Sequence, residues 1–227
     1  MASPSSQQHP NLTVMKSRAF DALFTKIRDR ETSSNDFVHY SKRAMRLLAE
    51  EAAAHLPTSP QAVTTPTNAI YNGHLSILDT NPDDVCAVSI VRAGDSLLEC
   101  VREIAPSVRV GKLWIQRNES SANKEAVHSC TKLPKGVKDM HILLLDPMLA
   151  TGGSACAALN TLIKEYGVDE ENIVFANVIS CPEGLEFVMK HFPRIKIVTC
   201  WIDECLNEEK FIMPGLGDYG DRFFNTV

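Results

Sequence analysis

The sequence predicts an α/β fold in which a mostly parallel sheet of five strands is flanked by helices. Short apolar segments alternate with amphipathic ones through most of the chain, and this alternation implies right-handed crossovers between parallel strands. The apolar segments are nearly continuous, which is typical of strands buried on both faces. With 227 residues, of which 44% are apolar and 22% are charged, the chain can bury such a sheet within one domain.

The first expected element is a helix over 36–54, because apolar residues recur on one face at helical spacing. Asp36 can act near its start as a cap or dipole partner, and Pro57 and Pro60 end it. The five strands are expected at 85–91, 108–115, 142–145, 173–178 and 195–201. Further helices are expected at 96–104, 154–166 and 183–191.

The ends of the chain are expected to differ from this core. Residues 1–15 are interpreted as a disordered tail, since Met1–Pro10 is polar and rich in Ser and Gln. Residues 16–227 are expected to form the single domain. No apolar run is long enough to span a bilayer, and the start of the chain lacks the apolar stretch of a secretory signal. A cytoplasmic protein without membrane contact is therefore expected.

Charge and cysteine content narrow the classes of function. The net charge of -5 argues against a nucleic-acid-binding surface, but it leaves room for a local basic pocket. The 7 cysteines include no CxxC pair, so reduced thiols are a better interpretation than a disulfide framework or a zinc site. No protein metal site is predicted.

The segment that follows the third expected strand has the features of a phosphate site. Asp146 ends a rigid apolar strand, and Gly152 and Gly153 lack the bulk that would keep a phosphate from the backbone. Ser154 is expected at a helix N-cap, where free N–H groups and the helix dipole favour an anion. The two glycines alone would be explained equally well by a tight turn. The acidic residue, Thr151 and Ser154 around them favour the anion site.

The segment is neither a kinase P-loop nor a dinucleotide-binding GxGxxG turn. It resembles the signature of the phosphoribosyltransferases, in the form of the uracil-specific branch, in which a proline replaces the second acidic residue. The matching residues are Asp146, Pro147, Met148, Leu149, Ala150, Thr151, Gly152, Gly153 and Ser154. The resemblance implies that all of them bind phosphoribosyl pyrophosphate (PRPP). Asp146 would face the ribose hydroxyls, and 150–154 would hold the 5'-phosphate.

A second motif lies at 211–224, where three glycines and a proline predict a rigid loop and neither a helix nor a strand. It is similar to the uracil-binding loop of the same family. A flexible Gly-rich tail is the alternative, which the flanking aromatic residues disfavour. The resemblance places uracil against Ile212, Gly217, Asp218 and Tyr219, with Asp218 also reaching PRPP.

Two arginines complete the expected site. Arg92 closes the first expected strand and Arg117 closes the second. The resemblance assigns both to the phosphates of PRPP, a task that suits a permanent charge with forked donors. Asp95 and Ser121 depart from the family pattern, and the arm over 120–133 matches poorly, which leaves its conformation open.

The resemblance, which covers most of the chain, implies an enzyme of pyrimidine salvage that converts uracil and PRPP to UMP and pyrophosphate. Asp146 and Asp218 would orient and stabilise the reactants, and Mg²⁺ would arrive on the diphosphate of PRPP. The fold would be phosphoribosyltransferase-like, with a small hood formed by roughly 200–227 and the N-terminal segment.

Several alternatives stay open at this point. One is an inactive or regulatory homologue that binds nucleotide, RNA or a protein partner. Another is an enzyme of the same fold acting on a purine or orotate, which Pro147 and the loop at 214–221 disfavour. A homodimer or homotetramer is expected. Activation by GTP, tolerance of 5-substituted uracils and the identity of any general base are not fixed by the sequence.

Overall fold

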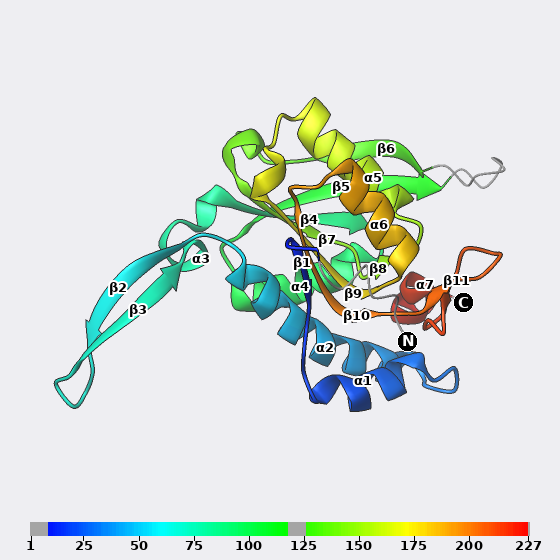
Figure 1. Cartoon of the computed structure of the whole chain (residues 1–227), viewed down its shortest axis with the longest axis horizontal. Helices are drawn as coiled ribbons and strands as arrows, with labels where there is room; N and C mark the ends of the chain where they lie inside the picture. The colour runs from blue at the N-terminus through cyan, green and yellow to red at the C-terminus, as the bar shows by residue number, and fades with distance from the viewer. Residues whose placement is uncertain (1–8, 118–125, 227) are drawn as a thin grey trace.

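The computed structural model describes residues 9–117 and 126–226, and it is built around one mixed sheet (Figure 1). In spatial order the sheet contains β1 (Leu12–Val14), β10 (Lys196–Ile202), β9 (Ile173–Ser180), β7 (His141–Leu145), β4 (Val85–Val91), β5 (Arg109–Arg117) and β6 (Ala126–Lys132). Neighbouring strands are parallel except for β6, which runs antiparallel to β5. The α/β class, the mostly parallel sheet and the five expected strands are confirmed.

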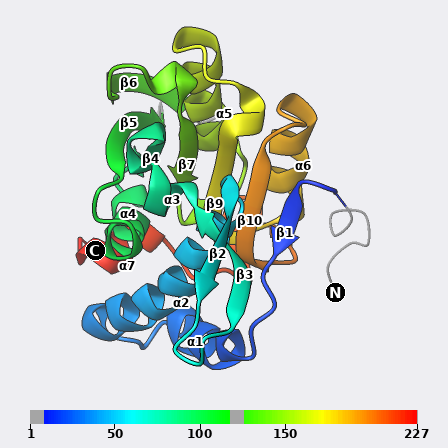
Figure 2. The same ribbon diagram turned by 90° about the vertical axis from the view of Figure 1, so that its left-hand side faces the viewer.

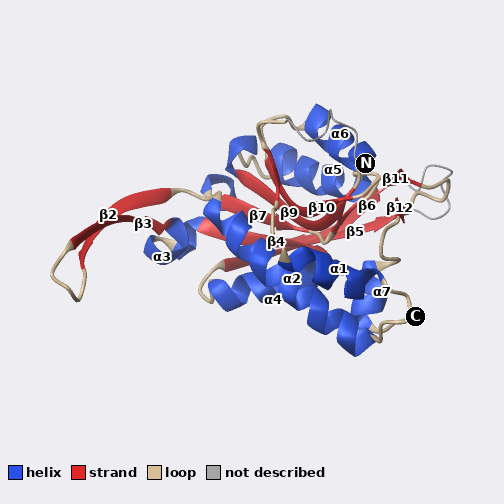
Figure 3. Cartoon of the chain, turned by 60° about the horizontal axis from the view of Figure 1, so that its bottom comes forward, coloured by secondary structure: helices blue, strands red, loops and turns tan. Residues whose placement is uncertain are grey.

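Helices cover both faces of the sheet (Figure 3). One face carries α1 (Ala19–Arg28), α2 (Ser34–Ala54) and α4 (Gly94–Ile104), whose apolar residues form one core with the sheet. The other face carries α5 (Gly153–Asn160) and α6 (Pro182–His191), which belong to a second core. Short 3-10 turns occur at η2 (Pro82–Asp84), η3 (Val137–Asp139) and η5 (Glu170–Asn172).

The edges of two helices differ from the sequence prediction. Ser33, and not Asp36, caps α2: its hydroxyl accepts a hydrogen bond from the Asp36 N–H at 3.2 Å. The helix expected over 154–166 is α-helical only to Asn160 and continues as one π-helical turn, η4 (Thr161–Glu165). Both differences concern which backbone groups pair at a helix end, which apolar spacing does not report.

The N-terminal prediction was wrong at one point. Residues 12–14 were expected within a disordered tail, but they form β1 beside β10, with Leu12 opposite Ile197. Met15 N–H extends the pairing by donating to the Thr199 carbonyl at 2.9 Å. A three-residue edge strand is too short to show a period in the sequence.

A hairpin of β2 (Thr58–Thr64) and β3 (Ile70–Ser76) projects from the body of the molecule (Figure 1) and points toward the viewer in Figure 2. It leads into the short helix α3 (Ile77–Thr80). Every residue of β2 is exposed. The sequence did not predict these strands, because Pro60 lies within β2 and neither strand alternates between an apolar and a polar face.

The C-terminal segment folds over the end of the sheet. It contains the two-stranded ribbon of β11 (Cys205–Leu206) and β12 (Ile212–Met213), followed by α7 (Tyr219–Phe224). The expectation of neither helix nor strand at 211–224 was therefore wrong. Tyr219 and Phe223 lie one turn apart and both are buried, so α7 is stabilised by packing against the core. No helix in the described parts of the chain is long and apolar enough to cross a membrane.

Candidate functional site

The carboxyl ends of β4, β5 and β7 open on a pocket of about 390 Å³, the edge of a parallel sheet at which ligands are expected. It unites residues from four separate segments of the sequence. The lining consists of Ile90, Val91, Arg92, Ala93, Ile115, Asp146, Met148, Ser154, Asp218, Tyr219 and Gly220. A smaller cavity of about 20 Å³ adjoins it and is lined by Asp146 and 148–155. The structure therefore brings Arg92, Asp146 and Asp218 together.

The smaller cavity lies at the start of α5. Gly152 occupies the N-cap position with φ of 82°, a left-handed conformation that glycine adopts readily. Thr151 Oγ1 accepts a hydrogen bond from the Gly153 N–H at 3.4 Å. Ser154 is thus the second residue of the helix and not its N-cap, as had been expected. Its side chain still lies at the helix start, where backbone N–H groups favour an anion.

Contacts with β9 and α6 fix this turn in place. The Pro147 carbonyl accepts hydrogen bonds from the N–H groups of Val178 and Ile179, both at 3.0 Å. The next two residues form β8 (Met148–Leu149), which pairs with β9. A Cβ atom on Gly184 would lie only 2.2 Å from the Ala150 carbonyl oxygen, so α6 packs directly on the turn. This turn, 150–154, which we call the cradle, is therefore held in one shape before any ligand arrives.

Asp146 follows β7 and is half-buried. Its backbone N–H donates to the Ala176 carbonyl at 3.3 Å, which continues the sheet pairing for one more residue. Its Oδ1 accepts from the Met148 N–H at 3.4 Å. Since Asp146 lines both cavities, it lies between the cradle and the larger pocket.

Arg92 follows β4, after a cis Val91–Arg92 peptide bond, and its side chain is bound to the C-terminal segment. Its guanidinium pairs with Asp221 Oδ1 at 2.5 Å and donates to Thr226 Oγ1 at 2.9 Å. The Phe224 ring centroid lies 5.6 Å from its Cζ. Hydrogen bonds from Thr226 and Arg92 hold the pKa of Asp221 below its usual range. An anion that binds Arg92 must share it with Asp221 or displace that carboxylate.

The residue after the Arg92–Gly94 loop, Asp95, has partners that the sequence did not reveal. Asp95 Oδ1 accepts from Ser89 Oγ at 2.7 Å, and Oδ2 accepts from Lys112 Nζ at 2.9 Å. A Cβ atom on Gly94 would lie 2.3 Å from the Leu145 carbonyl oxygen, so the loop packs against the end of β7. A lysine within an apolar strand was the available signal for Lys112, but its partner could not be inferred without the sheet register.

The predicted uracil-binding residues divide into two groups. Ile212 and Tyr219 point into the core, with 4% and 1% of their surface exposed. The Tyr219 hydroxyl donates to Met45 Sδ at 3.3 Å, and burial raises the pKa of this phenol. Asp218 is exposed and caps α7, because its Oδ1 accepts from the Asp221 N–H at 2.9 Å. Gly217, with φ of 82°, lies between these residues at the bend of the loop.

Gly217 also borders a second pocket, of about 400 Å³, on the side of the loop that faces the α1–α2 connection. The backbone at 217–219 therefore separates two cavities. Arg117 is the last residue of β5, and its side chain lies outside the part of the chain that the structure describes. The same holds for part of the arm predicted at 120–133, of which only β6 and the residue after it are described.

Comparison with known proteins identifies relatives over almost the whole chain. The sequence model of the family described as uracil phosphoribosyltransferase matches residues 14–226. The uracil phosphoribosyltransferase of Dictyostelium discoideum is 45% identical over 95% of this chain and 97% of its own length. The Schizosaccharomyces pombe protein named uracil phosphoribosyltransferase 1 is also 45% identical, over 96% of this chain and 97% of its own.

Two further relatives add to this result. An Arabidopsis thaliana protein named uridine/cytidine kinase UKL1, chloroplastic, is 42% identical over 96% of this chain, but this match covers only 43% of that protein. Among solved structures, the AQ2163 protein from Aquifex aeolicus superimposes with a TM-score of 0.79 and 29% identity, covering 95% of this chain and 99% of that one.

Proposed function

The chain belongs to the uracil phosphoribosyltransferase family, and from this membership we propose that it transfers the 5-phosphoribosyl group of PRPP to uracil, which yields UMP and pyrophosphate. The family match over 14–226 carries the proposal. The segment Asp146–Ser154 supports it, because it lines both cavities at the end of the sheet. The comparisons give no support for a regulatory or inactive homologue.

In this reaction a bond forms between N1 of uracil and the anomeric carbon of the ribose. The bond from that carbon to the pyrophosphate oxygen breaks, and its electron pair leaves with pyrophosphate. The proton of N1 is lost to solvent. Because positive charge develops on the ribose and negative charge on the leaving group, the protein must hold the two substrates in line and neutralise the diphosphate.

We assign the parts of PRPP to the residues around the pocket. The N–H groups and hydroxyls of 150–154 suit the 5'-phosphate, since the cradle is rigid and lies at a helix N-terminus. Asp146 would accept hydrogen bonds from the ribose hydroxyls, and Arg92 and Arg117 would bind the diphosphate. The Pro147–Leu149 stretch would support the same site.

Mg²⁺ fits this arrangement as an ion that enters with its substrate. Among the described residues there is no group of three or more side chains that could hold a metal. Asp146 and Asp218 at the pocket supply single hard oxygen ligands of the kind that Mg²⁺ accepts. The diphosphate and water would provide the remaining ligands, and the ion would stabilise negative charge on the leaving group.

Uracil would lie against the C-terminal loop and be recognised mainly by backbone groups. Because the side chains of Ile212 and Tyr219 are buried, these two residues can offer only N–H and C=O groups to the base. Gly217 leaves that backbone uncovered, and the carboxylate of Asp218 would reach the ribosyl substrate. A small pyrimidine with alternating donors and acceptors suits such a surface.

The proposed function is tested by incubating the protein with PRPP, Mg²⁺ and each of uracil, cytosine, hypoxanthine and orotate, with and without GTP. Of the four bases, only uracil is expected to give a product, UMP. Product from another base would contradict the uracil assignment, and folded protein that forms no product with any base would contradict the function. The arms with GTP decide whether this nucleotide is an activator.

We also propose that the enzyme works in the cytoplasm as a homodimer or homotetramer. The hairpin of β2 and β3 supports self-association: it contains no Asp, Glu, Lys or Arg, and it exposes Val63, Ile70 and Tyr71 by 47%, 75% and 62%. An isolated two-stranded hairpin is only marginally stable in water, and uncharged edge strands invite pairing. A second copy of the chain would cover this surface.

A further inference from the structure

An ion pair between Arg28 and Asp203, whose side chains are 20% and 1% exposed, anchors the C-terminal loop. We propose that the two residues position the uracil-binding loop, here defined as 212–218, and thereby set the affinity for the base without touching it. The inference rests on the proposed function, because it takes this loop as the base site. Neither residue lines the 390 Å³ pocket. Arg28 lines the 400 Å³ pocket on the other side of the loop, so any effect on a base bound in the 390 Å³ pocket must pass through the loop.

The pair joins elements that are far apart in the sequence. Arg28 is the last residue of α1, and Asp203 follows β10. The guanidinium donates from Nη1 to Asp203 Oδ2 at 2.9 Å and from Nη2 to Oδ1 at 2.6 Å. Only 1% of the Asp203 side chain is exposed. A forked contact of this kind fixes direction as well as distance.

The ion pair also binds both polar groups of one residue in the loop. Asp203 Oδ2 accepts from the Gly215 N–H at 2.9 Å, and Arg28 Nη1 donates to the Gly215 carbonyl at 2.7 Å. Gly215 has φ of 66°, and a Cβ atom there would lie 2.0 Å from the Ile212 carbonyl oxygen. The turn between Ile212 and Gly215 therefore has one shape, and the ion pair anchors it to the body of the protein.

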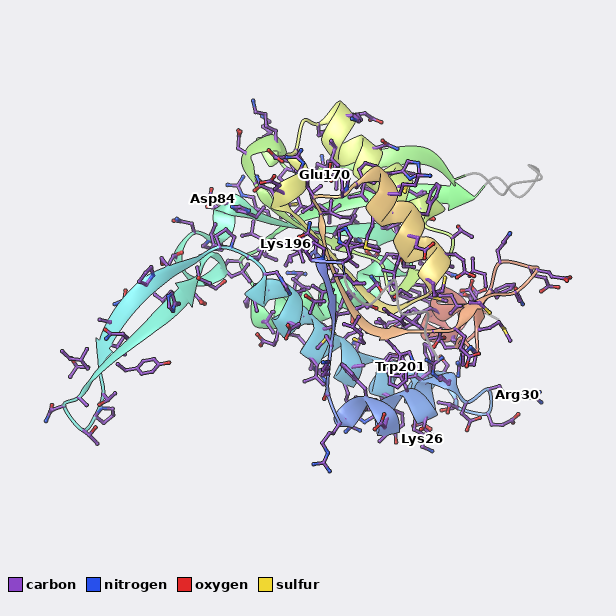
Figure 4. All side chains as sticks on the ribbon, in the orientation of Figure 1. Lys26, Arg30, Asp84, Glu170, Lys196 and Trp201 are labelled. Atoms are coloured by element: carbon purple, nitrogen blue, oxygen red, sulfur yellow. The ribbon has the colours of Figure 1, made fainter. Side chains whose placement is uncertain are left out.

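Aromatic residues fix the Arg28 side chain in turn. Its Cζ lies 5.2 Å from the Phe24 ring centroid and 5.7 Å from that of Trp201. Figure 4 labels Trp201 at the end of β10, beside α1. The two rings pack against each other with centroids 5.3 Å apart. The guanidinium thus has little freedom to move, so α1 and β10 determine the position of the loop.

A second arginine ties the same loop to the same helix. Arg222 Nη1 donates to the carbonyls of Ile27 and Leu216, each at 2.7 Å, and Nη2 donates to the carbonyl of Asp29 at 2.7 Å. It thereby pairs carbonyl groups at the end of α1 that lack partners within the helix. Leu216 is the neighbour of Gly215, so two consecutive loop residues are bound to the end of α1.

The pair has a consequence that a merely stabilising contact would lack. A buried ion pair often adds little net stability compared with apolar residues, but it can specify one arrangement of the groups around it. Here the arrangement is the backbone that would read uracil. Weakening the pair should therefore change recognition of the base much more than binding of PRPP, whose cradle is fixed by β9 and α6.

The test compares Arg28→Lys with Arg46→Lys. Arg46 makes a similar forked pair with Glu103, at 2.7 and 3.2 Å, on the surface between α2 and α4. Lysine keeps the charge but cannot bind Asp203 and the Gly215 carbonyl with the same fork. For Arg28→Lys, KM for uracil should rise about tenfold, as for loss of a charge-assisted hydrogen bond. KM for PRPP should stay within about twofold, and Arg46→Lys should resemble wild type.

A second readout does not depend on activity. In Asp203→Asn, which keeps the side-chain shape and removes the charge, the amides of Gly215 and Leu216 should exchange hydrogen faster than in Arg46→Lys. The inference is overturned if Arg28→Lys leaves KM for uracil unchanged or raises both KM values equally. It is also overturned if Asp203→Asn leaves hydrogen exchange in the loop unaltered. Wild-type protein that makes no UMP would instead contradict the proposed function, and the exchange comparison would still decide the positioning role.

Discussion

At the scale of single residues, Asp146 is the carboxylate on which the proposed reaction depends most. It lies between the cradle and the larger pocket, and its backbone is paired to β9. Asp146→Asn should therefore leave the fold unchanged and lower turnover about 100-fold or more, as expected when a preorganised charge at the reacting centre is removed. Steady-state rates and a thermal melt of the variant give the comparison. Near-normal turnover would contradict the role assigned to Asp146.

The Asp95–Lys112 pair leads to a second prediction at this scale. Lys112 Nζ lies 2.9 Å from Asp95 Oδ2. It compensates the negative charge of this carboxylate, which lies next to the loop that would bind diphosphate. Lys112→Met leaves that negative charge uncompensated, so KM for PRPP should rise several-fold while KM for uracil stays unchanged.

The control for this prediction is Lys42→Met, which breaks a pair with Glu99 of similar length, 2.7 Å, away from the pocket. Adding Asp95→Asn to Lys112→Met should restore part of the affinity for PRPP, because no charge is then left without a partner. A double variant with the same KM for PRPP as Lys112→Met would show that Lys112 acts in some other way.

At the scale of elements, the projecting hairpin gives the clearest prediction. Ile70→Lys and Tyr71→Lys place charge on exposed apolar positions of β3, which a monomer would tolerate. If a second copy covers the hairpin, these variants should shift the protein toward monomer in light scattering coupled to size-exclusion chromatography. Phe187→Lys, at a position 43% exposed on α6, is the matched control. An unchanged mass for both hairpin variants would exclude the hairpin as the interface.

The elements also show how far the sequence alone could predict the fold. β9 is buried throughout and β4 is buried except at Val91, so a nearly continuous apolar run predicted both strands. The turn between β7 and α5 was predictable for a similar reason, since strand, turn and helix are adjacent in the chain. By contrast, α7 has only six residues, and its helical state depends on Tyr219 and Phe223 reaching a core built from distant segments. Contacts of that kind leave no local pattern.

The candidate site shows the same contrast between local patterns, which could be predicted, and contacts between distant segments, which could not. Asp146, Arg92 and Asp218 were predicted, and all three line one pocket. The partners that restrain them were not predicted, because the Arg92–Asp221 contact spans 129 positions of the chain. The Arg28–Asp203 contact spans 175 positions. Such pairs depend on how the C-terminal segment folds back over the sheet.

At the scale of the whole molecule, buried thiols make stability depend on alkaline pH. Burial raises the pKa of Cys86 and Cys181 to about 12 and that of Cys100 and Cys156 to about 11. In the unfolded chain these thiols ionise near pH 8.5. The unfolded state therefore loses protons first, and stability that is present below about pH 8.5 should decline as pH rises toward 11.

Thermal melts between pH 7 and pH 10.5 measure this decline. Thiol labelling at pH 8 provides a check on the cause. Cys130 and Cys205, which are exposed, should react rapidly, whereas the buried Cys86, Cys100 and Cys181 should react only on unfolding. A melting temperature that stays constant up to pH 10.5 would contradict the assignment.

The contact between Arg92 and the segment at 221–226 has a practical consequence for recombinant expression. Thr226 donates to Asp221 at 2.7 Å while it accepts from Arg92, so a purification handle fused directly after these residues would crowd the arginine assigned to the leaving group. Assays of such a fusion would then underestimate the activity of the native enzyme. A handle at the opposite terminus avoids this, because β1 lies at the sheet edge, with β10, β9 and β7 between it and β4.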